Sequence, residues 1–267
     1  MQLHAGLAAA LAVWWIGCAV ALADACPPPR PLTFRVEGEI KRDVLGFTQG
    51  LEVHAGRLFE STGALAGDTR LTSIDPGTGR VTVLGNFDRT FFGEGLTILR
   101  EQIFQLSWRE HQVFVYDLKG RLLRKMRNPR EGWGLANDGQ SLIFTDGGDQ
   151  LHYADPETFA IRRSVPIRYG ATPLSAMNEI EYVDGKIYGN VFMTWSIVRV
   201  EPSTGCVDGV AELNALWARM SPQERAHINS DANFVLNGIA YDPVKNLFYL
   251  TGKNWKTIFT GRFVEAR

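Results

Sequence analysis

The sequence contains five copies of a short pattern in which a polar or aromatic residue precedes a small or acidic residue and an aliphatic one. The central residues are 50, 95, 134, 179 and 238, so successive copies lie 45, 39, 45 and 59 residues apart. The copies are Gln49-Gly50-Leu51, Glu94-Gly95-Leu96, Trp133-Gly134-Leu135, Asn178-Glu179-Ile180 and Asn237-Gly238-Ile239. If each copy opens an inner strand of a β-propeller, the five leading side chains converge at one end of the central channel. The pattern therefore predicts one pocket that contains Gln49, Glu94, Trp133, Asn178 and Asn237.

Glu94 is the principal acid–base candidate in this set. A carboxyl group among amides and indoles is partly desolvated, and desolvation raises its pKa toward the range useful for proton transfer near neutral pH. Glu179 and Glu181 are further acid candidates, whereas Glu60 and Asp146 are interpreted as turn residues. A purely structural alternative is that the pattern serves packing, because glycine lets two backbones approach closely. Packing explains the glycines but not the polar and indole side chains that precede them.

Other kinds of site have little support in the sequence. The five histidines share no metal-ligand spacing, and neither a His-x-Glu nor a Cys-x-x-Cys pattern occurs. A G-x-S-x-G nucleophile motif and a phosphate-binding glycine loop are also absent from the sequence. The formal net charge is −1, and the basic residues form only a local patch at 119–130. Nucleic acid is therefore not an expected partner.

The spacing of the copies also predicts the fold. A period of about 40 to 50 residues is typical of a β-propeller blade. Each copy is followed by a turn and a run of β-branched and aromatic residues, which indicates successive hairpins. We expect an all-β, five-bladed β-propeller that forms a single domain over residues 24–267. The strand at 34–40 is expected to lie beside the segment at 256–264, so that the two chain ends close the ring.

The longest interval between copies predicts a helical insertion. Within residues 210–227, Leu213, Leu216, Trp217 and Met220 fall at helical spacing. The stretch Ser221-Pro222-Gln223-Glu224 is a typical start of a second helix. This short helical insertion would lie between blades four and five, where a long connection is a candidate lid.

Residues 1–23 are interpreted as a secretory signal peptide. An apolar run covers residues 7–22, and Ala21-Leu22-Ala23 matches a cleavage site. We expect an exported protein, periplasmic or secreted, that leaves the membrane after cleavage; a retained anchor is the alternative. The mature chain keeps Cys26 and Cys206. An oxidising compartment favours a disulfide, but the sequence does not give their separation in space, so their pairing stays open.

Several stretches in order along residues 34–262 carry a resemblance to a known family. They are Gly46-Phe47-Thr48-Gln49-Gly50-Leu51, Glu60-Ser61-Thr62-Gly63, Phe92-Gly93-Glu94-Gly95-Leu96-Thr97, Gly132-Trp133-Gly134-Leu135, Asn178-Glu179-Ile180-Glu181-Tyr182, Val235-Leu236-Asn237-Gly238-Ile239-Ala240-Tyr241 and Thr251-Gly252-Lys253-Asn254-Trp255. Together they resemble the glutaminyl-peptide cyclotransferases of the plant and bacterial type. That family is described as five-bladed propellers that convert an N-terminal glutamine to pyroglutamate, release ammonia and use no catalytic metal.

The resemblance implies a role for each site residue. Glu94 would transfer protons, and Lys253 would stabilise negative charge that develops on the carboxamide oxygen. The implied substrate-binding residues are Phe47, Gln49, Phe92, Trp108, Trp133, Asn178, Phe192 and Asn237. Phe192 stands where a tryptophan is expected, and Met193-Thr194-Trp195 replaces a stretch that usually resembles Gln-Thr-Asp. These departures indicate a changed pocket shape.

The resemblance also implies partners and cofactors. The expected partners are peptides or proteins with an N-terminal glutamine, and a monomer is expected. Catalysis would need no cofactor. The resemblance also implies that a structural calcium ion is possible in the central channel. Two alternative functions remain open: a non-enzymatic exported propeller that binds peptides or proteins, and a calcium-dependent lactonase-like hydrolase. The hydrolase would need several acids around a metal, and the five leading positions supply only Glu94.

Overall fold

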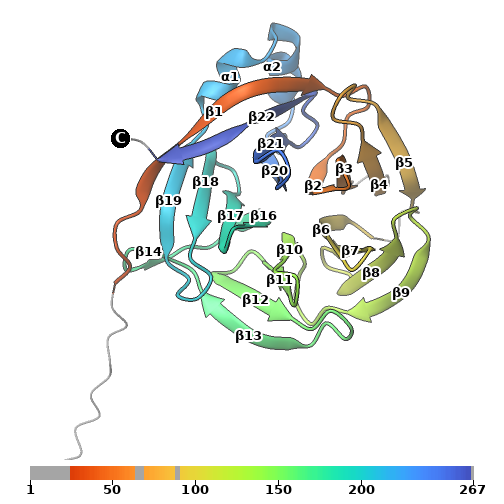
Figure 1. The fold of residues 1–267 in the computed structure, drawn as a ribbon, viewed down its shortest axis with the longest axis vertical. Coiled ribbons are helices and arrows are strands. Elements are labelled where there is room, and N and C mark those ends of the chain that lie inside the picture. The colour runs from red at the N-terminus through yellow and green to blue at the C-terminus, as the bar shows by residue number, and fades with distance from the viewer. Residues whose placement is uncertain (1–24, 64–68, 88–90, 266–267) are drawn as a thin grey trace, which may run out of the picture.

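The structure is a computed structural model that describes residues 25–63, 69–87 and 91–265. The segment interpreted as a signal peptide, residues 1–23, lies outside the described residues. The described part of the chain is mostly β, with two short helices, and its sheets are arranged radially around a central axis (Figure 1). In this part of the chain neither helix is long and apolar enough to cross a bilayer.

Three successive antiparallel sheets of four strands follow one another along the chain. The first consists of β2 (Thr48–His54), β3 (Arg57–Thr62), β4 (Arg70–Ile74) and β5 (Val81–Asn86). The second consists of β6 (Gly93–Leu99), β7 (Gln102–Ser107), β8 (Gln112–Asp117) and β9 (Leu122–Arg127). The third consists of β10 (Leu135–Asn137), β11 (Leu142–Phe144), β12 (Gln150–Ala154) and β13 (Ile161–Pro166). In each sheet the first strand lies nearest the central axis, and the last lies at the periphery (Figure 1).

An eight-stranded sheet joins the two ends of the chain. In order, it contains β16 (Met177–Val183), β17 (Lys186–Val191), β18 (Ser196–Val200), β19 (Val207–Glu212), β1 (Arg30–Lys41), β22 (Thr257–Glu265), β21 (Leu247–Gly252) and β20 (Leu236–Asp242). β1 runs antiparallel to β22 along most of its length and pairs in parallel with β19 only over residues 30–32. The predicted pairing of the N-terminal and C-terminal segments is confirmed. A small hairpin of β14 (Arg168–Tyr169) and β15 (Thr172–Pro173) completes the strands.

The inner strands approach one another through their glycines. A Cβ atom on Gly50 would lie 2.3 Å from the Leu96 nitrogen, and one on Gly134 would lie 2.1 Å from the Asn178 oxygen. Backbone-to-backbone contact is therefore possible only without side chains at these positions. The packing interpretation of these glycines is correct, and their close contacts hold the leading residues of neighbouring strands at one level.

Glu179 replaces glycine in the fourth copy and has a structural place. Its side chain is fully buried, and its two carboxylate oxygens accept hydrogen bonds from the backbone N–H groups of Leu51 at 3.3 Å and Ile239 at 2.7 Å. The carboxylate thus links β16 to both β2 and β20. Burial raises the pKa of Glu179 well above its ordinary range, despite the lowering effect of these hydrogen bonds.

The interpretation of Glu60 as a turn residue is wrong. Glu60 lies in β3, is 1% exposed, and forms a buried ion pair with Arg42 at 2.5 Å. Its carboxylate also accepts hydrogen bonds from the hydroxyls of Thr48 at 2.6 Å and Thr72 at 3.1 Å. A buried carboxylate needs such a set of partners, and only the tertiary structure supplies them. Asp146 does lie in a turn, where it accepts a hydrogen bond from the Gly148 N–H at 3.0 Å.

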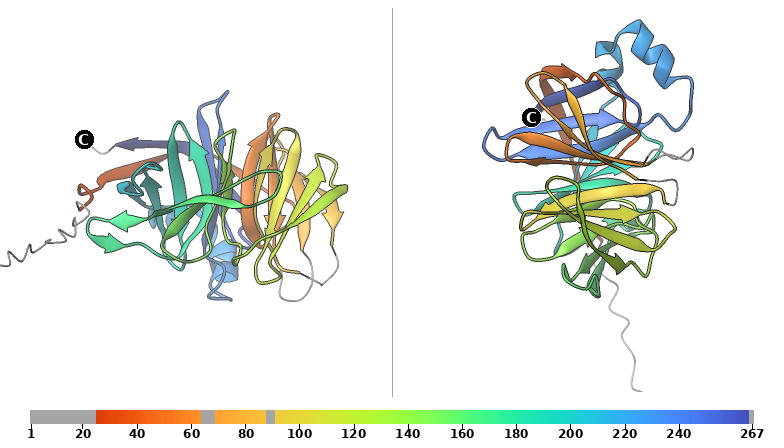
Figure 2. Two further views of the ribbon diagram at one scale, coloured as in Figure 1. Left: turned by 90° about the horizontal axis from the view of Figure 1, so that it is seen from below. Right: turned by 90° about the vertical axis from the view of Figure 1, so that its right-hand side faces the viewer.

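The predicted helical insertion is present between β19 and β20. It consists of α1 (Ala215–Arg219) and α2 (Pro222–Ile228), which project beyond one face of the molecule (Figure 2). Ser221 caps α2 by accepting a hydrogen bond from the Glu224 N–H at 3.1 Å, as its sequence predicts. The helical insertion begins later than the predicted range of residues 210–227, because residues 210–212 still belong to β19. Glu224 anchors α2 to β22 by accepting hydrogen bonds from the Thr257 N–H and hydroxyl.

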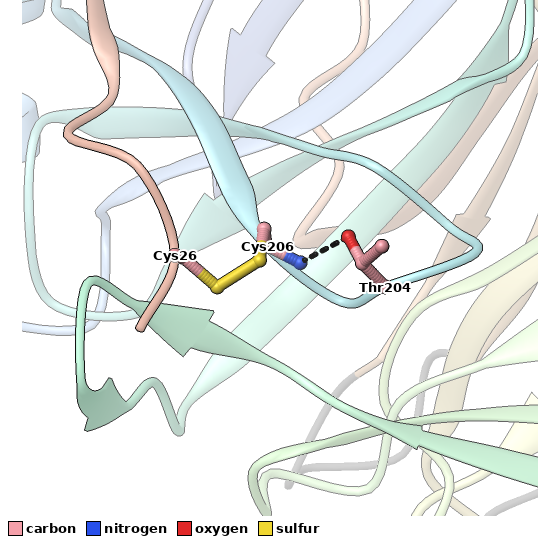
Figure 3. The surroundings of a disulfide bond; sticks show 3 residues. All are labelled: Cys26, Thr204 and Cys206. Atoms are coloured by element: carbon pink, nitrogen blue, oxygen red, sulfur yellow. Dashed lines mark hydrogen bonds between the residues drawn. A yellow bond between two sulfur atoms is a disulfide. The ribbon is translucent and has the colours of Figure 1, made fainter. Parts of the chain in front are cut away.

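Cys26 and Cys206 form a disulfide, with Cα atoms 5.4 Å apart (Figure 3). The bond ties the segment that precedes β1 to the start of β19, beside the short parallel pairing of these two strands. The Cys26 N–H also donates to the Gly170 carbonyl at 3.0 Å. The disulfide therefore secures the N-terminal segment at the junction of the eight-stranded sheet.

Replacing both cysteines by serine is expected to lower the free energy of unfolding by about 2 to 4 kcal/mol, the usual effect of removing a native disulfide. The residues that it joins are 180 positions apart, so the bond restricts a large loop of the unfolded chain. Urea denaturation of the mature wild type and the double variant measures the difference. A reducing agent should lower the stability of the wild type alone. Equal denaturation midpoints for the two proteins would contradict the prediction.

Candidate active site

A cavity of about 600 Å³ opens where the leading residues of the inner strands gather. Of the predicted site residues, those that line it are Phe47, Gln49, Phe92, Glu94, Trp108, Trp133, Asn178, Phe192 and Lys253. Asn237 does not line it and lies beneath Gln49. Residues of the cavity wall that were not predicted are Thr62, Gly63, Arg70, Asp231, Asn233, Phe234 and Asn254. Sequence positions far apart thus meet in one cavity.

Irregular strand pairing accompanies the leading residues. The pairing register shifts between Thr48 and Gly50 in β2, and between Gly93 and Leu96 in β6. Equivalent shifts occur at residues 177–180 of β16 and 236–239 of β20. A β-bulge changes the direction of the side chain at that point. The bulges therefore explain how residues at the ends of the inner strands point along the channel into the cavity.

Glu94 lies in this cavity with little access to solvent, at 5% exposure. Burial raises the pKa of its carboxyl well above the ordinary range; Lys253 opposes that shift, while Glu110 and Glu131 add to it. Gln49 Nε2 donates a hydrogen bond to Glu94 Oε1 at 3.4 Å. Burial thus favours the protonated carboxyl, which is the form able to deliver a proton to a bound molecule.

Lys253 follows β21 and is 4% exposed. Its Nζ lies 5.1 Å from the ring centre of Phe47 and 5.0 Å from that of Phe192, distances suited to cation–π attraction. Burial lowers the pKa of Lys253 to about 8, against the raising effect of Glu94. Lys253 is thus mostly protonated at pH 7 and is a cation placed in a desolvated cavity.

Asn237 orients Gln49 instead of facing the cavity. It is fully buried, and its Nδ2 donates to the Thr48 carbonyl at 3.0 Å and to Gln49 Oε1 at 3.2 Å. With its oxygen held by Asn237, Gln49 turns its NH₂ group toward Glu94. The three side chains form a hydrogen-bonded row from the core to the cavity.

Three buried polar atoms on residues of the cavity wall have no hydrogen-bond partner among the described residues. They are Nε of Arg70, the indole N–H of Trp133 and the side-chain oxygen of Asn178. A buried polar group without a partner costs free energy, so such groups at a cavity indicate positions for a bound molecule. The residues of the cavity wall therefore carry two free donors, on Arg70 and Trp133, and one free acceptor, on Asn178, in addition to Glu94 and Lys253.

Aromatic rings form most of the remaining wall. Phe92 packs edge-on against Phe47 at 6.2 Å and against Trp108 at 5.7 Å, while Trp133 packs edge-on against Phe192 at 5.7 Å. The Trp108 indole N–H donates to Glu131 at 3.0 Å, which fixes the plane of the ring. This wall suits a short side chain with an apolar stem and a polar end.

The remaining buried acids lie apart from the cavity. Glu181 accepts a hydrogen bond from the Tyr241 N–H at 3.0 Å, and Glu52 accepts from the Thr97 hydroxyl at 2.6 Å and the Ile98 N–H at 2.9 Å. Burial raises the pKa of Glu52 to about 7. Glu179 and Glu181, the other sequence candidates for acid–base chemistry, are therefore bound to backbone and do not line the cavity.

The loop that follows α2 supplies three of the wall residues that sequence reasoning missed. Asp231, Asn233 and Phe234 come from this loop, and the Phe234 ring packs against Phe47 at 6.3 Å. The only signal in the sequence was the long interval between the fourth and fifth copies. That interval indicated a candidate lid but did not identify which of its residues face the cavity.

Comparison with known proteins identifies similar chains. A family model described as Glutamine cyclotransferase matches residues 8–263. A glutaminyl-peptide cyclotransferase of Arabidopsis thaliana is 36% identical over 239 residues, which cover 86% of this chain and 71% of that protein. Among solved structures, the glutaminyl cyclase of Myxococcus xanthus superposes with a TM-score of 0.78 and 30% identity, covering 90% of this chain and 100% of the other.

Proposed function

The chain belongs to the glutamine cyclotransferase family, and on this premise we propose that it converts the N-terminal glutamine of peptides and proteins to pyroglutamate. The α-amino nitrogen forms a bond to the side-chain carboxamide carbon, the bond from that carbon to the amide nitrogen breaks, and ammonia leaves. The observation that carries the proposal is Glu94 buried in one cavity with Lys253, beside a free donor and a free acceptor. These groups match the needs of an intramolecular acyl transfer.

Substrate positioning is the first contribution of the cavity. The apolar stem of the glutamine lies against the aromatic wall, while its carboxamide meets the free polar atoms of Trp133 and Asn178. The indole N–H donates to the carboxamide oxygen, and the Asn178 oxygen accepts from the amino or amide nitrogen. Holding the flexible side chain in a curled form brings the amine to its target, which is a large part of the catalysis of an intramolecular reaction.

Proton transfer by Glu94 is the second contribution. The neutral α-amine attacks, and its nitrogen becomes positively charged in the tetrahedral intermediate. Glu94, whose protonated form burial favours by raising its pKa, gives its proton to the departing nitrogen and then takes one from the ring nitrogen. Glu94 is therefore protonated again at the end of the reaction, with no net gain or loss of protons by the enzyme. Lys253 stabilises the negative charge on the former carboxamide oxygen.

The proposed fold is a five-bladed β-propeller in one domain over residues 24–267. In this interpretation the three four-stranded sheets are blades, β16–β19 form a fourth, and β20–β22 with β1 form the fifth. The short parallel contact of β1 with β19 then joins two blades instead of continuing one sheet. The radial arrangement of the sheets around one axis supports this division (Figure 1).

Export to the periplasm or the exterior, after removal of residues 1–23, is part of the same proposal. The Cys26–Cys206 disulfide supports it, because such bonds persist in oxidising compartments. The proposed working form is a monomer that acts on peptides or proteins with an N-terminal glutamine and binds neither nucleic acid nor membrane.

We do not propose a calcium site built from acidic side chains in the channel. Across the described residues, no group of three or more His, Cys, Asp or Glu side chains is placed to hold a metal ion. Both oxygens of Glu179 already accept backbone hydrogen bonds. The mechanism above uses only Glu94, Lys253 and the binding residues, and we propose no cofactor for it.

Ammonia release from a glutamine-initiated dipeptide tests the function. The mature protein is expected to release one ammonia per pyroglutamate formed, equally with and without a chelator, and to leave an asparagine-initiated dipeptide unchanged. A coupled ammonia assay with mass spectrometry of the product measures both. Ammonia release that stops with chelator would favour the hydrolase alternative. Binding of the dipeptide without turnover would favour the non-enzymatic binding protein.

A further inference from the structure

A second cavity of about 490 Å³ lies beside the first and shares two wall residues with it, Asp231 and Phe234. The rest of its wall comes from the helical insertion, the loop that follows α2, the start of β20 and the loop between β17 and β18. That loop also provides Phe192 to the first cavity. The two cavities are therefore neighbours on one face of the molecule, separated by the loop that follows α2.

Indole rings and a methionine form one part of the second cavity, and the polar residues Thr194, Asn214, Asn229 and Asp231 form another. Trp217 of α1 packs edge-on against Trp195 at 5.9 Å, and Trp195 in turn packs against the buried Trp255 at 5.3 Å. Met193 is 55% exposed beside them. Its backbone is held at φ 63°, in the left-handed region that side-chain-bearing residues rarely adopt. An exposed flexible methionine next to indole rings is well suited to pack against ligands of varied shape.

The geometry of an extended peptide relates the two cavities. Successive residues of an extended chain advance about 3.3 to 3.6 Å and point alternately to opposite sides. A substrate whose first side chain enters the first cavity therefore directs its third side chain toward the same face. The second side chain points away from the protein as the backbone passes Asp231 and Phe234.

We propose that the second cavity binds an apolar or aromatic side chain at the third position of the substrate. The inference rests on the proposed function, because it places the N-terminal glutamine in the first cavity. Met193 and Trp217 supply the contacts, and neither lines the first cavity. The departure of Met193-Thr194-Trp195 from the family pattern then changes which substrates are preferred, while the reacting groups stay the same.

Two tripeptides of equal composition test the position directly: Gln-Gly-Phe-amide and Gln-Phe-Gly-amide. Wild type is expected to show a KM about tenfold lower for the peptide with phenylalanine third, the scale of an aromatic ring partly buried in an apolar pocket, at similar kcat. Trp217→Ala and Met193→Gly should each remove most of that difference. Met193→Gly tests the contact at an exposed position where glycine suits the backbone, so folding is preserved.

Gln-Gly-Gly-amide separates this inference from the function on which it rests. Its turnover should be the same in wild type, both variants and the control Tyr169→Ala, which removes a 47% exposed ring outside both cavities. Equal KM values for the two phenylalanine peptides, with normal turnover of Gln-Gly-Gly-amide, would overturn the second-cavity proposal alone. No turnover of any of the three peptides by wild type would overturn the proposed function and this inference with it.

Discussion

Glu94→Gln is expected to lower kcat by at least about 10²-fold, the usual scale for loss of a general acid–base group. The folded structure is expected to stay unchanged. Glutamine is nearly isosteric and can still pair with Gln49, but it cannot pass a proton to the departing ammonia. Because burial holds the Glu94 pKa above its unfolded value, the ionised carboxyl destabilises the folded state. The melting temperature should therefore stay the same or rise, most clearly at alkaline pH.

The pH profile gives this prediction a second readout. The mechanism needs both the protonated carboxyl of Glu94 and the ammonium of Lys253, whose pKa is about 8, so activity in wild type falls as pH rises through the loss of either proton. The acidic limb belongs to the substrate amine, whose ordinary pKa is about 7.7 to 8.0. In Glu94→Gln, Lys253 loses the carboxylate that raises its pKa. The alkaline limb of any residual activity should therefore move to lower pH.

Steady-state kinetics on a glutamine-initiated peptide, with ammonia release as the signal, measures the effect of Glu94→Gln. Glu101→Gln is a matched control, because its side chain is 72% exposed and lies outside the cavity. If Glu94→Gln has the same turnover as wild type, the proposed mechanism is wrong. The main reason for regarding this cavity as an active site is then also lost.

Lys253→Met is expected to lower kcat/KM by about 10² to 10³-fold, the range observed when one group that stabilises an oxyanion is removed. Methionine keeps an unbranched apolar stem against Phe47 and Phe192 but lacks the charge that balances the developing oxyanion. Burial of the ammonium has a desolvation cost, which its lowered pKa reflects. The variant should consequently be at least as stable as wild type, so that its loss of activity is not a loss of fold.

The direction of the pH shift distinguishes this variant from the first. Lys253 lowers the pKa of Glu94, so its removal lets that pKa rise further. The decrease in activity near pH 8 that deprotonation of Lys253 causes should disappear. The remaining decrease, caused by deprotonation of Glu94, should lie at higher pH. Lys256→Met, at an exposed lysine outside the cavity, is the matched control. A Lys253→Met enzyme with unchanged kcat/KM and an unshifted profile would exclude the assigned role.

The recurring pattern identified Gln49, Glu94, Trp133 and Asn178 as cavity residues, whereas Lys253 came from the family resemblance. A turn, a bulge and an inner strand are local features, and each copy of them places its first residue at an equivalent position around the axis. Gln49, Glu94 and Asn178 could therefore be assigned to one pocket before any contact was known. The pairing of the two chain ends and the helical insertion were predictable for the same reason. The strand-like alternation of side chains, the helical spacing of apolar residues and a capping serine are all properties of short segments.

Tertiary structure alone decided which groups are buried and with what partners. Nothing local distinguishes Asn237, which supports Gln49 from below, from Asn178, whose free oxygen faces the cavity. Glu60 resembles a turn residue in the sequence, yet Arg42, from outside its own sheet, makes it part of the core. Burial and charge at a point depend on residues brought together from several sheets, and pKa values follow from that assembly. A repeating pattern therefore determines where a side chain stands in the ring, whereas its protonation and its free hydrogen-bonding capacity depend on neighbours that the pattern does not specify.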